Sequence, residues 1–374
     1  MTADEREAEA DTGGDKFPEI EHTGGRITFH VDERGISTEF KHSNNCAASL
    51  HQVCVSHEGE ILDFVSFGGL GAVVPYPQPS ILVLLASDRE GMFGHACPRC
   101  KSYFRATSAV VQTCCYCGHR NHPVTFITPN QRQYIEKYCN AYIDAYNRQE
   151  TTEINLDAIV AALSNNKHDW AYSQEKLQSE HKCPCRTTFD ILGDYGLCPT
   201  CSRPNFSSVF EKKIASMAEE FESTNATLTD RTDREIAWEK LTRCVSEFEA
   251  LANVARNRLL RLPLTPKRRG DLASLSFQNL ENASKLLERW FGFEILANVS
   301  NEDRRFLNTM FNRRHVFTHK AGQIDQEYLD STGDTTVRLN QVIRFRSKEI
   351  RRLIPLIKLC SVNFLAGLDA MKSS

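Results

Sequence analysis

The chain has 374 residues, of which 41% are hydrophobic and 25% are charged, and its formal net charge is −3. This length predicts two or three domains, and the composition is that of a globular protein. The net charge excludes a protein that is basic throughout, so any surface that binds nucleic acid has to be local. No run of about 18 apolar residues is present, so we expect no membrane span.

The N-terminal part of the chain predicts a tail followed by strands. Residues 1–25 are acidic and polar and lack the apolar core of a signal peptide, which predicts a disordered tail on an intracellular, cytoplasmic protein. Residues 26–95 contain short β-branched and apolar runs separated by Gly, Pro and Asn, which predict a β-rich segment. Within it, the apolar run Ile81–Ala86 fits a buried strand.

The rest of the chain alternates cysteine clusters with helical patterns. Residues 96–126 and 181–205 each contain a cluster that we interpret as a small zinc ribbon, and these clusters are the only internal repeat in the sequence. Residues 127–180 predict a helical connector, and residues 206–374 predict an all-α bundle, because apolar residues recur at helical spacing. The expected fold class is therefore multidomain α+β.

The cysteines indicate metal sites. The sequence has 14 cysteines, and a chain without a secretion signal is expected in a reducing compartment, where clustered cysteines are more often metal ligands than disulfides. The first cluster contains two C-x2-C pairs, which supply four thiolates for tetrahedral Zn²⁺. These ligands are Cys97, Cys100, Cys114 and Cys117.

Three neighbours of the first cluster are alternative ligands. Cys115 is a fifth thiol, but Cys114 keeps the two-residue spacing, so we expect Cys115 not to bind metal. His119 and His122 could replace a thiolate, although four cysteines already close the site. Gly118 follows the second pair, at a position that suits a positive φ.

The second cluster has one irregular pair. Cys198 and Cys201 form a C-x2-C pair, whereas Cys183 and Cys185 are one residue closer together, and His181 is an alternative ligand. We expect two Zn²⁺ ions per chain, both structural, because four thiolates leave no open position for water. A further site around Cys46 and Cys54, with His42, His51 and His57 nearby, is a weaker alternative to buried thiols acting as small apolar residues.

The candidate for chemistry lies in the C-terminal helical region. Arg314 and His319 are separated by four residues, with His315 between them. An arginine can stabilise charge on a phosphate, and a histidine can exchange a proton with a ribose 2′-OH or a leaving 5′-oxygen. On a straight helix five residues turn through about 140°, so Arg314 and His319 converge only if the helix ends or bends near Thr318.

This stretch resembles the HEPN superfamily, whose motif is R-x4–6-H within a helical bundle and often has Asn, Asp or His after the arginine. The run of His319, Gly322 and I-D-x-x-Y ending at Tyr328 is similar to many of these proteins. The resemblance covers residues 206–374 and implies a homodimer with a composite site made by two motifs. It also implies either a metal-independent endoribonuclease in a toxin or defence system, or a binding domain that has lost activity.

We therefore predict an endoribonuclease with Arg314, His315 and His319 as catalytic residues and with RNA as its partner, together with a possible regulatory protein. The alternative is a non-catalytic zinc-binding sensor or adaptor for nucleic acids or nucleotides. Two basic clusters could support phosphate binding, although a solvated helix face explains each cluster alone. They are Arg256, Arg258, Arg261, Lys267, Arg268 and Arg269, and Arg344, Arg346, Lys348, Arg351 and Arg352.

Overall fold

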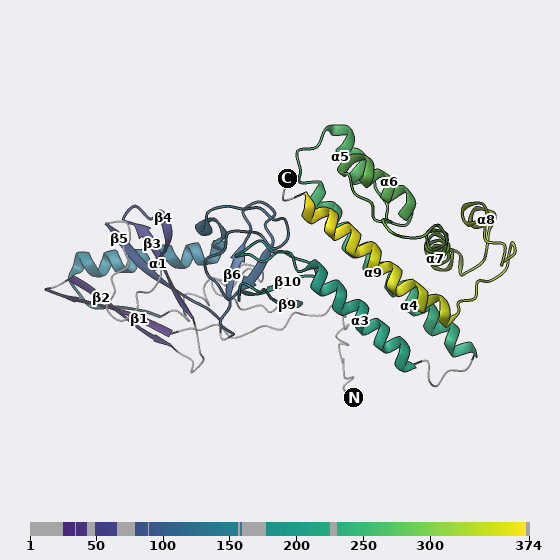
Figure 1. Ribbon diagram of the computed structural model, residues 1–374. Coiled ribbons are helices and arrows are strands. Elements are labelled where there is room, and N and C mark those ends of the chain that lie inside the picture. The colour runs from purple at the N-terminus through teal and green to yellow at the C-terminus, as the bar shows by residue number, and fades with distance from the viewer. Residues whose placement is uncertain are drawn as a thin grey trace, which may run out of the picture. The chain divides into compact units, whose positions relative to one another are not determined.

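A computed structural model describes residues 25–33, 35–42, 49–65, 79–88, 90–155, 158, 177–224 and 230–371 (Figure 1). The predicted tail lies almost entirely outside the described residues. The chain divides into two compact units, residues 1–205 and residues 206–374. Strands occur in the first unit and long helices fill the second, so the coarse α+β class is confirmed.

Two three-stranded antiparallel sheets form the larger part of the first unit. One has the order β2-β1-β8, and the other has the order β4-β3-β5. The first is made of β1 (Gly25–Asp32), β2 (Gly35–His42) and β8 (Thr152–Asn155). The second is made of β3 (Leu50–Ser56), β4 (Ile61–Val65) and β5 (Ser80–Ala86). Alternate residues Ile81, Val83 and Leu85 of β5 are buried, which confirms the predicted buried strand.

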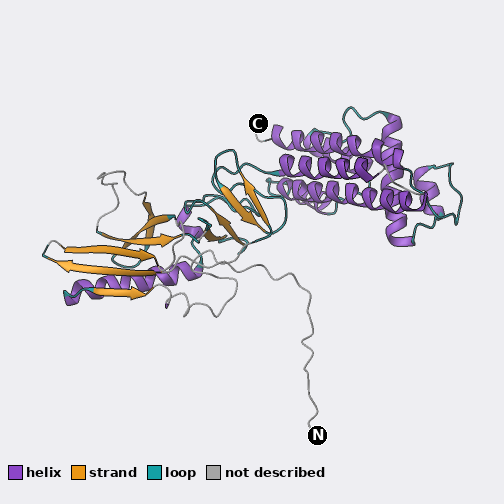
Figure 2. Ribbon diagram, turned by 90° about the horizontal axis from the view of Figure 1, so that it is seen from below, coloured by secondary structure: helices purple, strands orange, loops and turns teal. Residues whose placement is uncertain are grey.

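Helix α1 (Pro129–Arg148) packs on both sheets and completes their common core (Figure 2). Thr128 caps its first turn, because its hydroxyl accepts from Gln131 N while the Gln131 side chain accepts from Thr128 N. The helix ends at Gln149, whose φ of 58° is left-handed. The predicted helical connector over 127–180 is therefore wrong in part: after Gln149, the β-branched Thr152 and Ile154 extend into β8, which pairs with β1.

A third, four-stranded sheet carries both cysteine clusters. Its order is β6-β7-β10-β9, so the hairpin of the first cluster pairs with the hairpin of the second through β7 and β10. The strands are β6 (Phe93–Ala96), β7 (Tyr103–Ala106), β9 (Ser179–Lys182) and β10 (Thr188–Ile191). A short 3₁₀ helix, η1 (Pro123–Phe126), links this region to α1.

The second unit is a helical bundle. Its described helices are α3 (Phe206–Thr224), α4 (Asp230–Leu259), α5 (Pro266–Ala273), α6 (Leu280–Phe291), α7 (Asn301–Lys320), α8 (Gln326–Thr332) and α9 (Ser347–Ala370). Helices α3, α4 and α9 lie side by side in both views (Figure 1). Helix α7 packs on α4, where Trp238 stacks on Phe317 with 3.8 Å between ring centroids.

Helix α9 bears on the expectation that the chain contains no membrane span. Among the described helices it is the one that is long and apolar enough to cross a membrane by length and composition alone. Its buried side chains, among them Leu353, Ile357 and Phe364, line one face, and α9 packs against α4. A core helix of a bundle has the same apolar content, so this feature is weak support for a membrane span.

Candidate metal centres and candidate catalytic site

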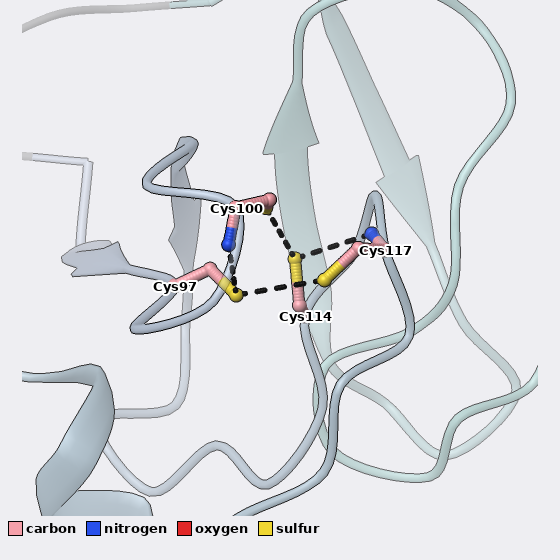
Figure 3. A group of neighbouring side chains, drawn as sticks. All are labelled: Cys97, Cys100, Cys114 and Cys117. Atoms are coloured by element: carbon pink, nitrogen blue, oxygen red, sulfur yellow. Dashed lines mark hydrogen bonds between the residues drawn. The ribbon is translucent and has the colours of Figure 1, made fainter.

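Site I consists of Cys97, Cys100, Cys114 and Cys117, whose sulfur atoms converge from two turns (Figure 3). The Sγ atoms of Cys97 and Cys117 are 3.6 Å apart, as are those of Cys100 and Cys114. A disulfide requires about 2.05 Å, so these thiols are not bonded to one another. Tetrahedral coordination by thiolates at about 2.3 Å places sulfurs about 3.8 Å apart. Site I could therefore hold one metal ion.

The turns of site I explain why the spacing works. Cys97 N donates to Ser102 O at 3.0 Å, and Lys101 N donates to Cys97 O at 3.0 Å. The second turn repeats this pattern, since Gly118 N donates to Cys114 O at 3.0 Å and the φ of Gly118 is 64°. Each turn also directs a backbone N–H at the first sulfur of its pair, at 3.5 Å from Cys100 N and 3.4 Å from Cys117 N. The positive φ predicted for Gly118 is confirmed.

Site II consists of Cys183, Cys185, Cys198 and Cys201, and it could hold a second metal ion. The Sγ atoms of Cys183 and Cys201 are 3.4 Å apart, and those of Cys185 and Cys198 are 3.5 Å apart. All four ligand atoms lie within 4.8 Å of one another, as they do in site I. The irregular Cys183–Cys185 spacing therefore does not prevent four sulfurs from converging.

A shortened turn accommodates that spacing. Cys183 N donates to Thr187 O, four residues on, whereas Cys97 N donates to Ser102 O, five residues on. Thr187 Oγ1 then lies 3.5 Å from Cys185 Sγ, as Ser102 Oγ lies 3.3 Å from Cys100 Sγ. The turn of site II is therefore one residue shorter than that of site I, and a hydroxyl lies beside the second sulfur in both.

The two sites are halves of one pseudo-twofold module. Thr113 N donates to Pro199 O at 3.0 Å, and Leu197 N donates to Cys115 O at 2.9 Å. In each of these bonds, the residue before one C-x2-C pair donates to the residue after the first cysteine of the other pair. The reciprocal bonds and the β7–β10 pairing join the clusters, so the internal repeat in the sequence corresponds to a single fused structure.

Equivalent side chains support the same symmetry. The ring of His95 stacks on Phe104 with centroids 5.3 Å apart, and His181 lies 5.4 Å from Phe189 in the corresponding hairpin. His181 thus has the structural position of His95, two residues before the first cysteine, and it does not belong to the converging ligands of site II. Cys115 is 1% exposed and lies in the shared apolar core, and it does not belong to those of site I.

The centre of this module contains a buried charge network that the sequence analysis missed. Arg105 on β7 pairs with Asp190 on β10, with Nε 3.1 Å from Oδ2. Its other nitrogens contact Asp88 at 3.3 Å and Glu90 at 2.8 Å. Arg105 and Asp88 have fully buried side chains, so removing either partner would leave an uncompensated charge. The spacing of residues along the chain does not indicate this network, because its members lie in three separate segments.

Local hydrogen bonds favour the thiolate form of one ligand in each site, whereas burial raises the pKa of Cys97 and Cys114 in site I and of Cys183 and Cys198 in site II. Burial opposes ionisation of Cys100, yet hydrogen bonds from the side chain and backbone of Ser102 lower its pKa to about 7. Burial also opposes ionisation of Cys185, and the corresponding bonds from Thr187 lower its pKa to about 6. Thiolate is the form that binds metal, so each site has one ligand that is readily deprotonated near neutral pH.

The other candidate ligands do not form a site among the described residues. There, the two cysteine groups are the sets of Cys, His, Asp or Glu that could hold a metal ion. Cys46 lies outside the described residues, and Cys54 is buried in β3. His51 packs edge-on against Phe93, and burial lowers its pKa. His122 Nε2 lies 3.8 Å from Asp63 Oδ1, away from site I.

In α7 the two histidines meet, but the arginine has a different partner. The rings of His315 and His319 have centroids 4.7 Å apart, and His319 is exposed. Arg314 Nη2 instead lies 3.3 Å from Glu249 Oε2 and 3.4 Å from Ser246 Oγ, both on α4. Among the described residues, no hydrogen bond or ion pair joins Arg314 to either imidazole.

The helix geometry explains that separation. Helix α7 continues through Lys320, and Ala321 closes it with a left-handed φ of 50°. Arg314 and His319 therefore stay about 140° apart around the axis. Burial lowers the pKa of His315, and the positive charges of His319 and Lys320 lower it further. His315 is consequently neutral, and able to accept a proton, over a wider pH range than an ordinary histidine.

The neighbouring Arg313 belongs to a buried network. Its guanidinium contacts Asp334 at 2.8 Å and Glu349 at 2.8 Å, and its Nε donates to Tyr328 Oη at 3.1 Å. Tyr328 Oη in turn donates to Asp334 at 2.7 Å. Tyr328, which the sequence analysis associated with the candidate motif, thus holds Arg313. The two adjacent arginines face different surroundings because consecutive residues point about 100° apart on a helix.

Most of the predicted basic clusters have structural partners. Arg269 donates to the carbonyls of Leu260 and Leu262 just beyond α4, and Arg256 donates to Leu275 O at 2.8 Å. On α9, Arg351 pairs with Glu222, and Arg352 pairs with Glu302 and Asp303. In contrast, no carboxylate among the described residues pairs with any of three exposed cations. They are Arg344, Arg346 and Lys348.

Comparisons of the chain with models of protein families, with curated proteins and with solved structures found no match. The function therefore has to be inferred from the geometry of the two cysteine sites and of α7.

Proposed function

We propose that the protein is a zinc-bearing endoribonuclease that cleaves RNA without a catalytic metal. Zinc suits sites I and II because each offers four sulfurs, and no oxygen or nitrogen ligand of the kind that other divalent ions prefer. Both ions would be structural, since four thiolates complete the coordination shell. In this proposal the two sites are zinc ribbons that stabilise a surface for RNA.

The paired imidazoles at the end of α7 carry the enzyme proposal. RNA cleavage by its own 2′-OH needs a base that takes the hydroxyl proton and an acid that protonates the leaving 5′-oxygen. His315, with its lowered pKa, is suited to the first role, and the exposed His319 is suited to the second. Arg314 would stabilise the charge on the pentacoordinate phosphate.

A dimer would solve the geometric difficulty within this proposal. Arg314 and His319 diverge around α7, so one chain does not direct both at the same phosphate. The HEPN resemblance implies a composite site, in which the arginine of one copy acts with the histidine of the other. Each Arg314 would then exchange its contact with Glu249 for the phosphate, to which a guanidinium can make two parallel charge-assisted hydrogen bonds.

Cleavage of total RNA in EDTA by the full chain tests the enzyme proposal. We expect wild type to cleave, while His319→Ala and Arg314→Ala lose at least about a hundredfold in rate. The matched control is Arg305→Ala, an exposed arginine on the same helix whose side chain has no ion-pair partner among the described residues. No cleavage by wild type, or equal cleavage by His319→Ala, would sink the proposal.

Mixing two inactive variants tests the composite site. A heterodimer of Arg314→Ala and His319→Ala has one intact pair and one doubly altered pair, so mixing should restore part of the activity. If each chain contains its own complete site, mixing restores nothing, and the dimeric arrangement is wrong even though the enzyme proposal survives.

A second candidate function is a non-catalytic zinc-binding protein that senses or carries nucleic acid. The ion pair of Arg314 with Glu249 favours it, because a committed arginine has a structural role. Exposed cations in the cysteine turns, such as Lys101, Arg186 and Arg203, would then contact phosphates. This candidate predicts RNA binding without cleavage. A cytoplasmic location and a regulatory protein partner are parts of both proposals.

A further inference from the structure

Sites I and II differ in how far their cysteines are exposed to solvent. In site I, each close pair of sulfurs includes a buried cysteine, either Cys97 or Cys114. In site II, Cys201 is exposed and its close partner Cys183 is half-buried, so an oxidant in solution can reach both. Site II is therefore the more accessible site for chemistry at sulfur, which depends on the exposure of the thiolate.

The two accessible sulfurs are also the closest ones. The Sγ atoms of Cys183 and Cys201 are 3.4 Å apart, compared with 3.5 or 3.6 Å in the other close pairs. A disulfide needs about 2.05 Å, so the two atoms have to approach by only about 1.4 Å. Oxidation of one sulfur therefore leaves the other within reach of it.

The hairpin that carries Cys183 is less buried than the hairpin of site I. Its outer strand β9 alternates half-buried and exposed residues, whereas the first three residues of β6, the equivalent strand of site I, are buried. Strand β6 is also tied to α1, because Gln131 Nε2 donates to Gly94 O at 3.1 Å. The hairpin of site II can therefore rearrange while that of site I keeps its packing.

Thiols elsewhere in the described part of the chain do not compete for an oxidant. Cys115 is buried in the core of the module. Four further cysteines outside the two sites are buried as well, namely Cys54, Cys139, Cys244 and Cys360. Buried structural thiols are inert towards oxidants in solution, so the reaction is directed to site II.

We propose that site II is a site of reversible oxidation, where hydrogen peroxide converts Cys183 and Cys201 into a disulfide and releases the zinc ion, while site I keeps its ion. The thiolate of one cysteine attacks a peroxide oxygen, forms a sulfenic acid and releases hydroxide. The second thiolate attacks that sulfur, forms the S–S bond and releases a second hydroxide. Two thiolates thus lose two electrons, and one peroxide becomes two waters after taking up two protons. The two remaining thiolates do not complete a coordination shell, so the ion leaves.

Oxidation changes the surface that the cysteine module presents. Cys183 directly follows β9 and begins the turn to β10, so the loss of zinc loosens this turn and the exposed Arg186 within it. A small thiol such as reduced glutathione reverses the step, because two of its molecules are oxidised to a disulfide as the two cysteines are reduced. The oxidation does not depend on RNA cleavage, since none of its residues belongs to α7.

Release of zinc from the full chain by hydrogen peroxide, followed with a colorimetric zinc indicator, tests the proposal. The chain should start with about two ions, and the first should leave at least about tenfold faster than the second, because oxidation selects exposed thiolates. Alkylation of the remaining thiols and peptide mapping should then show a disulfide between Cys183 and Cys201. Reduced glutathione with added Zn²⁺ should restore both thiols and the lost ion.

Matched histidine substitutions identify the site. Cys201→His keeps a set of three cysteines and one histidine that binds zinc, but it removes one partner of the disulfide, so the rapid release should disappear. Cys117→His makes the same change at the equivalent position of site I and should leave the rapid release unchanged. The disulfide map of the wild-type chain decides the matter even if a variant does not fold. Equal release from both sites, a first disulfide between Cys100 and Cys117, or a starting content of about one ion would overturn the proposal.

Discussion

The spacing of residues along the sequence determines whether side chains converge less strictly in the cysteine module than in helix α7. In the module, ligands sit in turns, and a turn can lose one residue while its sulfurs still converge, as the pairs Cys97–Cys100 and Cys183–Cys185 do. In α7 each residue rotates by about 100°, so the spacing fixes the directions of Arg314 and His319 and keeps them apart. The spacing of cysteines in turns can therefore vary by one residue at a metal site, whereas the spacing of residues in a helix fixes the angle between their side chains.

Removing one ligand is the largest test of the cysteine module. Cys114→Ala should lower bound zinc from about two ions per chain to about one and unfold the hairpin of β6 and β7. Structural zinc contributes on the order of 10 kcal/mol to the folding of small zinc domains. Elemental analysis after gel filtration measures the zinc, and limited proteolysis reports the unfolding.

The adjacent cysteine is the control. Cys115→Ala removes a thiol that is equally buried but lies in the apolar core, so it should keep both ions and cost only about 1 kcal/mol. If Cys115→Ala loses zinc and Cys114→Ala keeps it, the ligand set is wrong. If site II never holds zinc, its shortened turn is not equivalent to the turns of site I.

Two adjacent arginines give the next largest contrast. Arg313→Met should destabilise the helical unit by about 3–5 kcal/mol, because it leaves two carboxylates without their positively charged partner. Arg314→Met should cost about 1 kcal/mol, since Glu249 has a raised pKa through burial and can take up a proton. Urea unfolding followed by fluorescence of Trp238, which stacks on Phe317 of α7, measures both.

Equal losses in the two variants would contradict this division of roles. A loss of several kcal/mol in Arg314→Met would mean that its ion pair with Glu249 is a structural element of the bundle. That result would favour the non-catalytic candidate, because an arginine so committed is not available to a phosphate.

Local sequence patterns correctly predicted the features that depend only on neighbouring residues. The strand over Ile81–Ala86 followed from its composition, and site I followed from paired cysteines and Gly118. The strands β2 and β3 were not predicted individually, since their polar and charged residues obscure the alternation. The strand β8 was taken as helix, because its four residues gain their conformation from pairing with β1.

Contacts between distant segments were beyond the sequence. Arg105 and Asp190 are 85 positions apart in the sequence and meet only because two hairpins pair side by side. Likewise, no pattern distinguishes Arg313 from Arg314 until α4, α8 and α9 surround the helix. The sequence identified which side chains could do chemistry, and packing determined which of them have other partners.

The titration of His315 is a smaller test of α7. Burial, followed by the charges of His319, Lys320 and Arg314, lowers its pKa below 6.5, whereas Glu327 opposes the shift. His319→Gln should therefore move the pKa of His315 upward, though not to the full ordinary value, because burial remains. NMR of the imidazole protons measures the midpoint without relying on activity.

The pH dependence of cleavage should follow the same midpoint if His315 is the base. The rate would rise with pH as His315 loses its proton, and the half-maximum of this rise would lie at the lowered pKa of His315, below 6.5. A measured pKa at or above 6.5 would contradict the expected environment. A rise whose half-maximum is unrelated to that pKa would remove His315 from the proposed chemistry.

The smallest expected effects concern two equivalent cations in the cysteine turns. Lys101 and Arg186 each follow the second cysteine of a pair, and their φ values of 62° and 75° are left-handed. That conformation costs roughly 1–2 kcal/mol for a residue with a Cβ atom, whereas glycine adopts it freely. The same left-handed φ occurs after the other two pairs, at Gly118 and Ser202, so the turn itself requires it. Exposed cations at two of these four positions, where glycine would cost less, favour a role in binding phosphate.

Lys101→Gly and Arg186→Gly separate that role from stability. Each substitution relieves strain but frees the unfolded chain, so the free energy of unfolding should change by less than about 1 kcal/mol. If the turns contact single-stranded RNA, each loss should reduce the slope of log affinity against log salt by about 0.7. Lys137→Ala, at an exposed site on α1, removes the same charge and should leave the slope unchanged. Unchanged RNA binding in both glycine variants would rule out this role for the turns and would assign recognition to the helical unit, where the spacing of side chains is fixed by helices and not by turns.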